Sequence, residues 1–244
     1  TKLIEMQKDL EKARRSAEAS DRSKSYFLAQ ASHDLRQPMQ ALRIFISTLE
    51  EEPLDNRQKE LLGKISASAD NLNNLLDNLL DISKLDSEGF EACLGNFDIS
   101  DLLKNIFFEF HEIARSRGIH FHTSLCHYTV SSDALLVERV IRNLLSNAFK
   151  YTRSKVLLGC KRENDRIRVL VMDNGEGITA EEKERIFDEF YQSRNINDNS
   201  RSGAGLGLSI VRRISDILGL DISVDSRPGR GSSFSFLLPL EKGT

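Results

Sequence analysis

Apolar residues recur at alternating three- and four-residue spacings in the first third of the chain, the pattern of helices that pack along a seam. Residues 51–55 (EEPLD) interrupt this pattern and predict a turn, so the two helices form an antiparallel hairpin. One hairpin cannot bury both seams, so the pattern predicts a homodimer whose two hairpins form a four-helix bundle. The first seam consists of Leu28, Ala31, Leu35, Pro38, Leu42, Phe45 and Leu49, and the second of Leu61, Ile65, Ser68, Leu72, Leu75, Leu79 and Ile82.

A weaker seam among charged residues precedes the hairpin. It predicts a coiled-coil linker helix over residues 1–22, followed by the hairpin domain over residues 23–88. The heptad register of this weaker seam differs from the register through Leu28 by a stutter, an irregular spacing that locally unwinds a coiled coil. Such a feature suits a helix that transmits rotation. A loosely packed polar linker explains the same residues equally well.

The pattern changes after residue 88, where helical periodicity stops and Gly89 and Gly95 appear. A second domain is therefore predicted over residues 89–244. Adjacent strands suggest an antiparallel sheet with helices on one face, so the fold class of the whole chain is α+β with two or more domains. The predicted helices are at about 99–116, 133–150, 180–188 and 206–218, and the predicted strands at about 119–125, 155–162, 166–173, 221–226 and 232–239.

Composition narrows the possible partners. The 244 residues are 39% hydrophobic with a net charge of −3, and no basic block occurs, which argues against nucleic acid binding. Cys93, Cys126 and Cys160 are widely spaced, so they are interpreted as separate core thiols in a reducing compartment. No apolar run approaches the roughly 20 residues of a membrane span. We expect a cytoplasmic chain without membrane contact of its own; a membrane tether before Thr1 is left open.

In the heptad pattern that defines the first seam, His33 occupies position f, which points away from the seam, and Asp34 follows it. Core packing does not explain an imidazole that points to solvent next to a carboxylate. Histidine is well suited to accept and pass on a charged group near neutral pH. Pro38 removes one helical hydrogen bond, so a kink is expected one turn after His33.

A polar stripe is predicted on the helix over residues 133–150, where Asn143, Asn147 and Lys150 follow one another at about one-turn spacing. The other faces of this helix are apolar, so the stripe should border a cavity. An amide oxygen suits Mg²⁺, and a nearby lysine suits a phosphate on the same ion. A solvated helix face is the alternative for this stripe taken alone.

Two glycine clusters follow. Asp173 ends a predicted strand and precedes a tight turn with Gly175 and Gly177, while residues 202–208 (SGAGLGL) open a helix whose N-terminus can receive phosphate. A dinucleotide-binding fingerprint also fits the first cluster, but the parallel strand that it requires does not follow, and no P-loop motif occurs. Residues 192–201 lack apolar anchors and are expected to form a mobile lid.

In order and spacing, these motifs resemble the catalytic core of the sensor histidine kinases of two-component signalling, over almost the whole chain. Residues 33–38 resemble the H box of that family, residues 143–152 its N box, and residues 173–177 its first glycine box. Residues 186–191 resemble its F box and residues 203–207 its second glycine box. The resemblance implies a dimerisation and phosphotransfer hairpin followed by a Bergerat-type ATP-binding domain, the type shared with gyrase, Hsp90 and MutL.

The resemblance also implies roles for single residues. Asp173 would accept a hydrogen bond from the adenine amino group, Asn147 would hold Mg²⁺, and Asn143 and Lys150 would lie by the phosphates of ATP. The remaining nucleotide-site residues that it implies are Tyr151, Gly175, Gly177, Gly203, Gly205, Leu206 and Gly207.

For the chemistry, the resemblance implies that Asp34 accepts the Nδ1 proton of His33 and that Nε2 attacks the γ-phosphorus of ATP. His33 would then pass the phosphoryl group to an aspartate of a response-regulator receiver domain. Hydrolysing relatives carry a glutamate where Asn143 stands, and an amide cannot act as a base. Gln37 replaces the usual Thr or Asn that positions water for dephosphorylation of the receiver, which leaves phosphatase activity open.

Three rival functions remain at this point: a kinase-dead or phosphatase-biased scaffold, a Bergerat-type ATPase, and a plain helical interaction module. The last would leave the glycine boxes unexplained. The sequence also leaves open the stimulus, the partner receiver, and whether phosphorylation occurs within or between protomers.

Overall fold

A computed structural model describes residues 34–86, 90–192 and 205–241. The chain divides into two compact units, Thr1–Phe90 and Glu91–Thr244, and each is described by itself. The predicted linker helix over residues 1–22 lies outside the described residues, as do His33, Gly203 and, except for Gln192, the lid predicted over residues 192–201. The predicted domain limits at residues 23 and 89 stay predictions.

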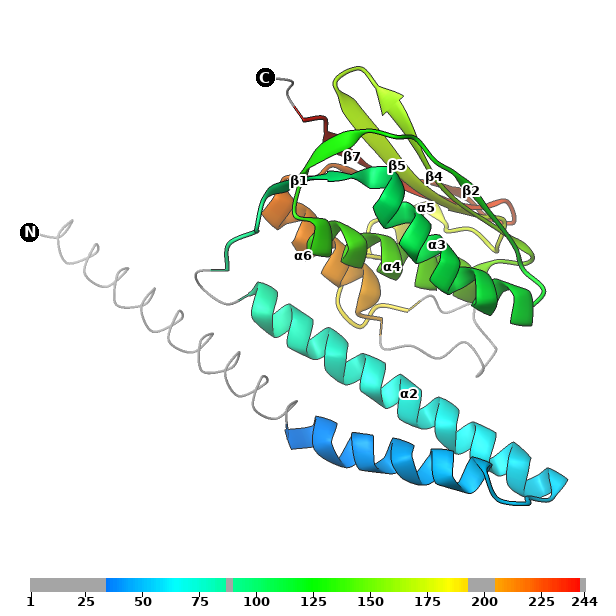
Figure 1. Cartoon of the computed structure of the whole chain (residues 1–244). Coiled ribbons are helices and arrows are strands. Elements are labelled where there is room, and N and C mark those ends of the chain that lie inside the picture. The colour runs from blue at the N-terminus through cyan, green and yellow to red at the C-terminus, as the bar shows by residue number, and fades with distance from the viewer. Residues whose placement is uncertain (1–33, 87–89, 193–204, 242–244) are drawn as a thin grey trace, which may run out of the picture. The chain divides into compact units, whose positions relative to one another are not determined.

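Where the structure describes it, the first unit consists of two neighbouring helices (Figure 1). Residues 34–50 are helical through Pro38, a turn follows, and α2 (Asn56–Leu85) runs back alongside them. A capping box starts α2: Asp55 Oδ1 accepts from Gln58 N at 2.8 Å, and Gln58 Oε1 accepts from Asp55 N at 2.9 Å. The predicted turn therefore also supplies the signal that begins the second helix.

The two helices pack through residues next to the predicted seams. Met39 and Ile46 are buried against Leu62, Ala69 and Leu76 of α2. Much of both predicted seams faces solvent within one chain, so the packing of the seam residues against a second hairpin stays a prediction. Seam side chains that remain 37% to 64% exposed are Leu35, Leu42, Phe45, Leu49, Leu61, Ile65 and Leu72.

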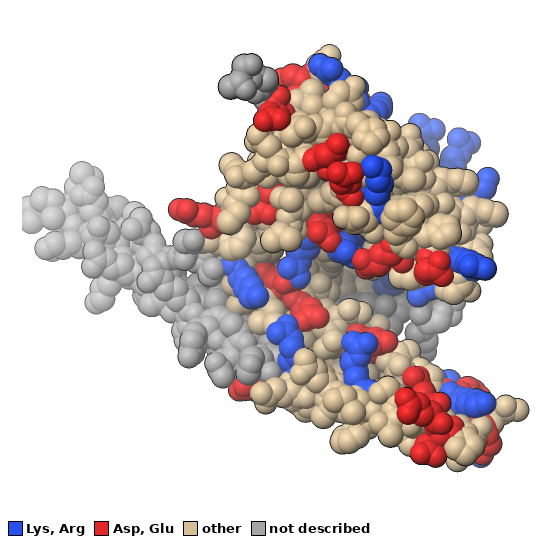
Figure 2. All heavy atoms as spheres, in the orientation of Figure 1, with Lys and Arg blue, Asp and Glu red and all other residues tan. Residues whose placement is uncertain are grey.

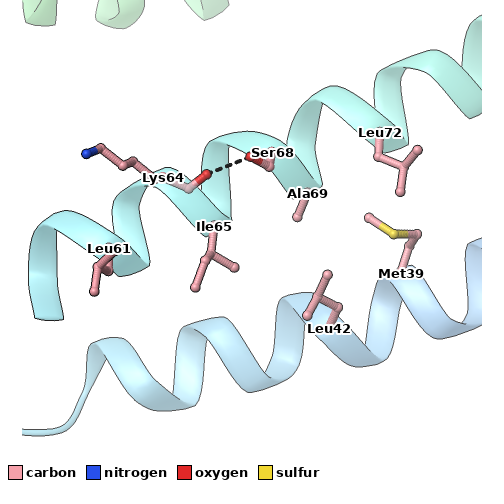
Figure 3. A pocket seen from close by; sticks show the side chains of 8 residues that line it. All are labelled: Met39, Leu42, Leu61, Lys64, Ile65, Ser68, Ala69 and Leu72. Carbon is pink, nitrogen blue, oxygen red and sulfur yellow. Dashed lines mark hydrogen bonds between the residues drawn. The ribbon is translucent and has the colours of Figure 1, made fainter.

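An open groove of about 360 Å³ is lined by four of these exposed side chains, Leu42, Leu61, Ile65 and Leu72, together with Met39, Lys64, Ser68 and Ala69. Figure 3 shows Leu42 and Met39 of the first helix opposite Ile65 and Leu72 of α2. Ser68 is polar by type, but its hydroxyl donates to the carbonyl of Lys64 at 2.9 Å and so is satisfied within the helix. The groove is therefore mainly apolar.

The second unit combines a five-stranded sheet, ordered β2-β4-β5-β7-β6, with a two-stranded sheet, β1-β3. Figure 1 shows α3, α4 and α6 on one face of the larger sheet. The element bounds are β1 (Gly95–Asp98), α3 (Ile99–Ser116), β2 (His120–Ser124), β3 (Thr129–Ser132), α4 (Ala134–Tyr151), β4 (Lys155–Glu163), β5 (Arg166–Asp173), α5 (Ala180–Lys183), α6 (Gly207–Leu218), β6 (Ile222–Arg227) and β7 (Gly231–Pro239).

Three expectations for this unit need correction. The sheet is mixed, because β2 pairs with β4 in parallel, whereas an antiparallel sheet was predicted. The predicted helix over 180–188 is helical only in α5, and turns follow it. β1 and β3 pair with each other and were not predicted; each has only four residues, too few for a clear alternation of apolar and polar positions.

The helices close a core over the sheet because each is strongly amphipathic. Asp98 caps α3 by accepting from Ser100 N at 2.7 Å, and Asp133 caps α4 by accepting from Leu135 N at 3.0 Å. The largest fully buried side chains come from α3, α4, α6 and the central strands, among them Ile99, Leu103, Ile106, Ile141, Leu144, Leu145, Leu158, Ile167, Ile210, Ile214 and Phe236.

The cysteine prediction is wrong. Cys126 and Cys160 form a disulfide with Cα atoms 5.7 Å apart, and Cys93 is exposed rather than in the core. Spacing in the sequence could not indicate this pair, because only the parallel pairing of β2 with β4 brings two residues 34 positions apart into contact.

Acidic and basic side chains are interspersed on the visible surface (Figure 2). Several form pairs, such as Arg142 with Glu109 and Glu138. Burial lowers the pKa of Arg142, but the hydrogen bonds to these two glutamates outweigh it and raise the pKa overall. In the described segments, no helix has both the length and the apolar character needed to cross a membrane.

Candidate functional site

The polar stripe of α4 lies beside the start of α6. Asn143, Asn147 and Lys150 are half-buried, and Asn143 Nδ2 donates to the carbonyl of Arg139 at 2.9 Å. A Cβ added at Gly207 would lie 3.0 Å from Asn143 Oδ1, so the first turn of α6 approaches the stripe closely. The structure thus brings these two predicted motifs, far apart in the sequence, to one place.

The start of α6 presents backbone rather than side chains. Leu206, its N-cap residue, is 1% exposed and supplies no side-chain hydrogen bond to the described first turn. Its side chain is therefore a core residue, and it could contribute to the predicted site only through its backbone. The free N–H groups at a helix N-terminus suit an anion such as a phosphate.

Asp173 ends β5 next to the first glycine turn. Its Oδ1 accepts from Gly175 N at 2.7 Å. Burial raises the pKa of Asp173 above its ordinary value, while hydrogen bonds from the backbone N–H groups of Gly175 and Ser232 act in the opposite direction. A partly buried carboxylate held by backbone donors is a rigid acceptor for a ligand N–H group.

Glycine is required in this turn for steric reasons. A Cβ at Gly175 would overlap the carbonyl oxygen of Tyr151, so the turn packs directly against the end of α4. Gly177 has φ +74°, and a Cβ there would overlap the carbonyl oxygen of Arg227 in β6. The glycines therefore let three separate segments meet around Asp173.

Asn174 joins the same segments by hydrogen bonds that the sequence did not reveal. Its Oδ1 accepts from Thr152 Oγ1 at 2.9 Å, from Ser154 N at 3.1 Å and from Lys155 N at 2.9 Å. Thr152 is the C-cap of α4, so Asn174 fixes the end of that helix to the end of β5. The Asp-Asn-Gly order at a strand end is the signal that could have pointed to this role.

Two buried serines hold the other side of the turn. Ser226 Oγ accepts from Ile178 N at 2.8 Å and donates to the carbonyl of Gly231 at 2.9 Å, and it lies 3.0 Å from Ser232 Oγ. Because β6 and β7 carry these serines, the closing hairpin positions the glycine turn. Serine is common on strands, so sequence reasoning had no ground to single them out.

The F box segment is held against α6 by arginines. Arg213 donates to Glu189 Oε1 at 2.6 Å, and Arg212 lies 6.0 Å from the Phe187 ring. Gly205 has φ +72°, and a Cβ there would lie 2.8 Å from the carbonyl carbon of Phe190. The two described ends that flank residues 193–204 are therefore in contact.

Lys150 and Tyr151 complete the described part of the predicted nucleotide set. The Lys150 ammonium lies 5.0 Å from the centre of the Tyr151 ring. No cluster of three or more His, Cys, Asp or Glu residues that could hold a metal ion occurs in the described part of the chain. Any divalent ion here would depend on an amide ligand together with ligand phosphates.

The predicted catalytic residues lie on the first unit. Asp34 and Gln37 are exposed on the helix over residues 34–50, and Arg36 donates to Asp77 of α2 at 2.7 Å. These residues and the Asp173 region belong to different units of the chain.

Comparison with known proteins identifies both units. Residues 132–242 match the profile of the histidine kinase-, DNA gyrase B- and HSP90-like ATPases, and residues 23–88 match the His Kinase A phospho-acceptor domain. These two matches define the class of protein, in which a phospho-acceptor hairpin is joined to an ATPase-type domain. The chain belongs to the sensor histidine kinases and carries their catalytic core.

Among relatives, the sensor protein GacS of Pseudomonas syringae pv. syringae is 34% identical over 98% of this chain and 28% of its own length. The sensor histidine kinase RcsC of Escherichia coli K12 is 30% identical over 97% of this chain and 25% of its own length. The crystal structure of full-length ShkA in complex with AMPPNP superposes with a TM-score of 0.72 at 28% identity, covering 89% of this chain and 46% of that one. The chain thus spans about a quarter of the length of these curated relatives.

Proposed function

We propose that this chain transfers the γ-phosphoryl group of ATP to His33 and then to an aspartate of a receiver domain. The observation that carries the proposal is the convergence of Asp173, the α4 stripe and the start of α6 in a chain that also has a phospho-acceptor hairpin. Asp173 would bind the adenine amino group, and the start of α6 would face the phosphates. Tyr151, Gly175, Gly177 and Gly205 would shape the walls of the site.

The residues present fit a magnesium ion bound mainly by phosphates. Mg²⁺ commonly takes only one or two protein ligands and completes its shell with phosphate oxygens and water. Asn147 would supply the protein ligand, with Lys150 and Asn143 beside the phosphates. Bound in this way, the ion would neutralise charge that develops on the phosphoryl oxygens.

For the transfer step, the lone pair of His33 Nε2 forms a bond to the γ-phosphorus while the bond from phosphorus to the ADP oxygen breaks. Asp34 accepts a hydrogen bond from Nδ1–H, which leaves Nε2 free to attack, and its carboxylate stabilises the positive charge that develops on the ring. Asn143 has no basic group with which to activate water, so ATP would wait for His33 rather than hydrolyse.

A labelling experiment tests this function. Wild-type chain incubated with γ-labelled Mg-ATP should incorporate label that is labile to acid and stable to alkali, as a phosphohistidine is. His33→Gln and Asn147→Ala should both lose the label, whereas His111→Gln, at an exposed histidine on α3, should keep it. ATP binding without label in the wild type would refute the kinase function and favour a phosphatase-biased scaffold, with Gln37 as the residue to examine.

We also propose that the chain acts as a homodimer. Its support is the exposed apolar seam on both helices and the groove between them (Figure 3). A second copy of the hairpin presents the same apolar pattern and would cover this surface as a four-helix bundle. Patches of this kind are uncommon on monomeric proteins.

A further inference from the structure

Two ion pairs link the helices of the hairpin. Arg36 Nη2 lies 2.7 Å from Asp77 Oδ1, and Arg43 Nη2 lies 3.9 Å from Asp70 Oδ1. In both pairs the cation is on the helix over residues 34–50 and the anion is on α2.

The spacing of the two ion pairs matches one alignment of the two helices along their length. Arg43 follows Arg36 by one heptad on the first helix, and Asp70 precedes Asp77 by one heptad on α2. Antiparallel helices bring such positions together in one alignment only. Charged pairs that flank an apolar seam set alignment in this way in coiled coils.

The apolar contacts alone do not select this alignment. Met39 and Ile46 are one heptad apart, and so are Leu62, Ala69 and Leu76, so a slide by one heptad would still oppose apolar residues. Only the observed alignment forms both ion pairs. A slide in one direction would pair Arg43 with Asp77 but place Arg36 against Lys84. A slide in the other direction would pair Arg36 with Asp70 but leave Arg43 opposite Gly63.

Stability is not what these pairs chiefly provide. The side chains of Arg36 and Asp77 are 42% and 47% exposed, and ion pairs this exposed contribute little to the free energy of folding. Alignments that bury similar apolar residues differ little in free energy, so even a small difference in ion pairing can decide which alignment forms. Arg36 is only three residues after His33, so a change in the alignment of the two helices would also displace the phospho-acceptor histidine.

We propose that the ion pair between Arg36 and Asp77 fixes the register of the hairpin and is thereby a positioning pair for phosphorylation of His33. This inference rests on the proposed kinase function. The pair between Arg43 and Asp70 is longer and lies two turns further along the helix, so it serves as the matched control.

The first test reverses the charge of one residue of the pair and measures the rate of His33 phosphorylation. Asp77→Arg should lower kcat by about tenfold or more, because small misplacements of reacting groups cost at least that much. The KM for ATP should stay within about twofold, since the nucleotide site is on the other unit. The double reversal Arg36→Asp with Asp77→Arg should restore most of the rate, and Asp70→Arg should cost less than about threefold.

The second test reads the register without using activity. With the three native cysteines replaced by serine, new cysteines at Gln40 and Asn73 should crosslink on mild oxidation. Gln40 lies between Arg36 and Arg43, and Asn73 lies between Asp70 and Asp77, so the two ion pairs place these positions at the same level of the hairpin. Asp77→Arg should divert crosslinking from that pair to Gln40 with Ser66, one heptad away, where Arg36 would face Asp70. The double reversal should restore the first crosslink.

The outcomes separate the two proposals. An unchanged rate with Asp77→Arg, or no rescue by the double reversal, would overturn the positioning role. Equal losses from Asp77→Arg and Asp70→Arg would show a general loss of stability instead. A wild-type chain that never labels His33 would refute the proposed kinase, and the crosslinks alone would then decide whether the ion pair fixes the register.

Discussion

The carboxyl group of Asp173 makes the stability of the second unit depend on pH. Its carboxylate is partly buried, and burial raises its pKa from the ordinary value of 3.8. The folded protein therefore holds this proton more tightly than the unfolded chain does. The stability that this proton contributes is present below pH 3.8 and is lost as the pH rises through the higher pKa of the folded state.

Replacement of Asp173 by Asn should therefore separate stability from binding. At pH 7 the variant no longer buries a charge, while its amide oxygen can still accept from Gly175 N, so we expect a Tm equal to or slightly above that of the wild type. ATP affinity should fall by at least about tenfold, because a charged acceptor of the adenine amino group is lost.

Two measurements check this expectation. Thermal unfolding of both proteins between pH 4 and pH 7 should show a Tm advantage of Asp173→Asn that is absent near pH 4 and grows as the pH rises. Titration with ATP should show the loss of affinity. A Tm that falls well below wild type at pH 7 would mean that the carboxylate stabilises the fold.

The conformation of Gly177 gives a second prediction at this scale. Gly177→Ala should lower Tm and weaken ATP binding, because the alanine would need a positive φ and would overlap the carbonyl oxygen of Arg227. Gly118→Ala is the control, since Gly118 has φ +65° but nothing within 4 Å of a Cβ. In the control, the free energy of unfolding should fall only by the cost of the backbone conformation, about 1 kcal/mol, and ATP should bind normally.

Single residues also mark the limit of sequence reasoning. Asp173 and the glycines stand out because few other residue types suit a strand end followed by a tight turn. Asn174, Ser226 and Ser232 do not stand out, because their roles depend on partners more than 15 residues away or on a neighbouring strand. The buried and half-buried polar residues that hold the glycine turn in place were therefore missed, while the predicted nucleotide-site residues stay predictions.

At the scale of elements, the accuracy of prediction followed the strength of the local pattern. The predicted helix over 99–116 coincides with α3 and the predicted strand over 166–173 with β5, since each has a sustained apolar period. β1 and β3 were not predicted, because four residues are too few to show a clear alternation of apolar and polar positions. The parallel pairing of β2 with β4 could not be predicted, because α3, β3 and α4 decide which strands become neighbours.

That parallel pairing leads to a prediction about the cysteines. Without reductant, the folded protein should show one reactive thiol, that of Cys93, and three after reduction and unfolding. Cys160→Ser should lower Tm by roughly 10 °C relative to the oxidised wild type, because the disulfide closes a loop of more than 30 residues in the unfolded chain.

Cys93→Ser is the control for this prediction, since its thiol is exposed and unpaired in the second unit. It should leave Tm unchanged and abolish labelling of the native protein. Three reactive thiols in the native, unreduced protein would contradict the disulfide and restore the interpretation of separate thiols.

At the scale of the whole molecule, one chain leaves its hairpin incompletely buried. Ile44 and Phe45 are 63% and 64% exposed, and Leu61, Ile65 and Leu72 on α2 are each about half exposed. Full burial of a side chain of this size contributes about 1.5 to 3 kcal/mol, so covering several half-exposed side chains in both copies would offset much of the cost of association. The heptad pattern of the sequence predicts this partner as well, although it does not show which residues of each helix face inward within one chain.

The dimer can be tested by placing a charge on the exposed seam. Phe45→Lys should convert the protein from a dimer into a monomer of 27.6 kDa in light scattering after size-exclusion chromatography, because a lysine in the bundle core would bury an unpaired charge. Gln40→Lys adds the same charge at an exposed polar position of the same helix and should remain dimeric. Circular dichroism should show folded helices in both variants. If Phe45→Lys stays a dimer, the two copies associate through another surface, and the exposed seam needs a different partner.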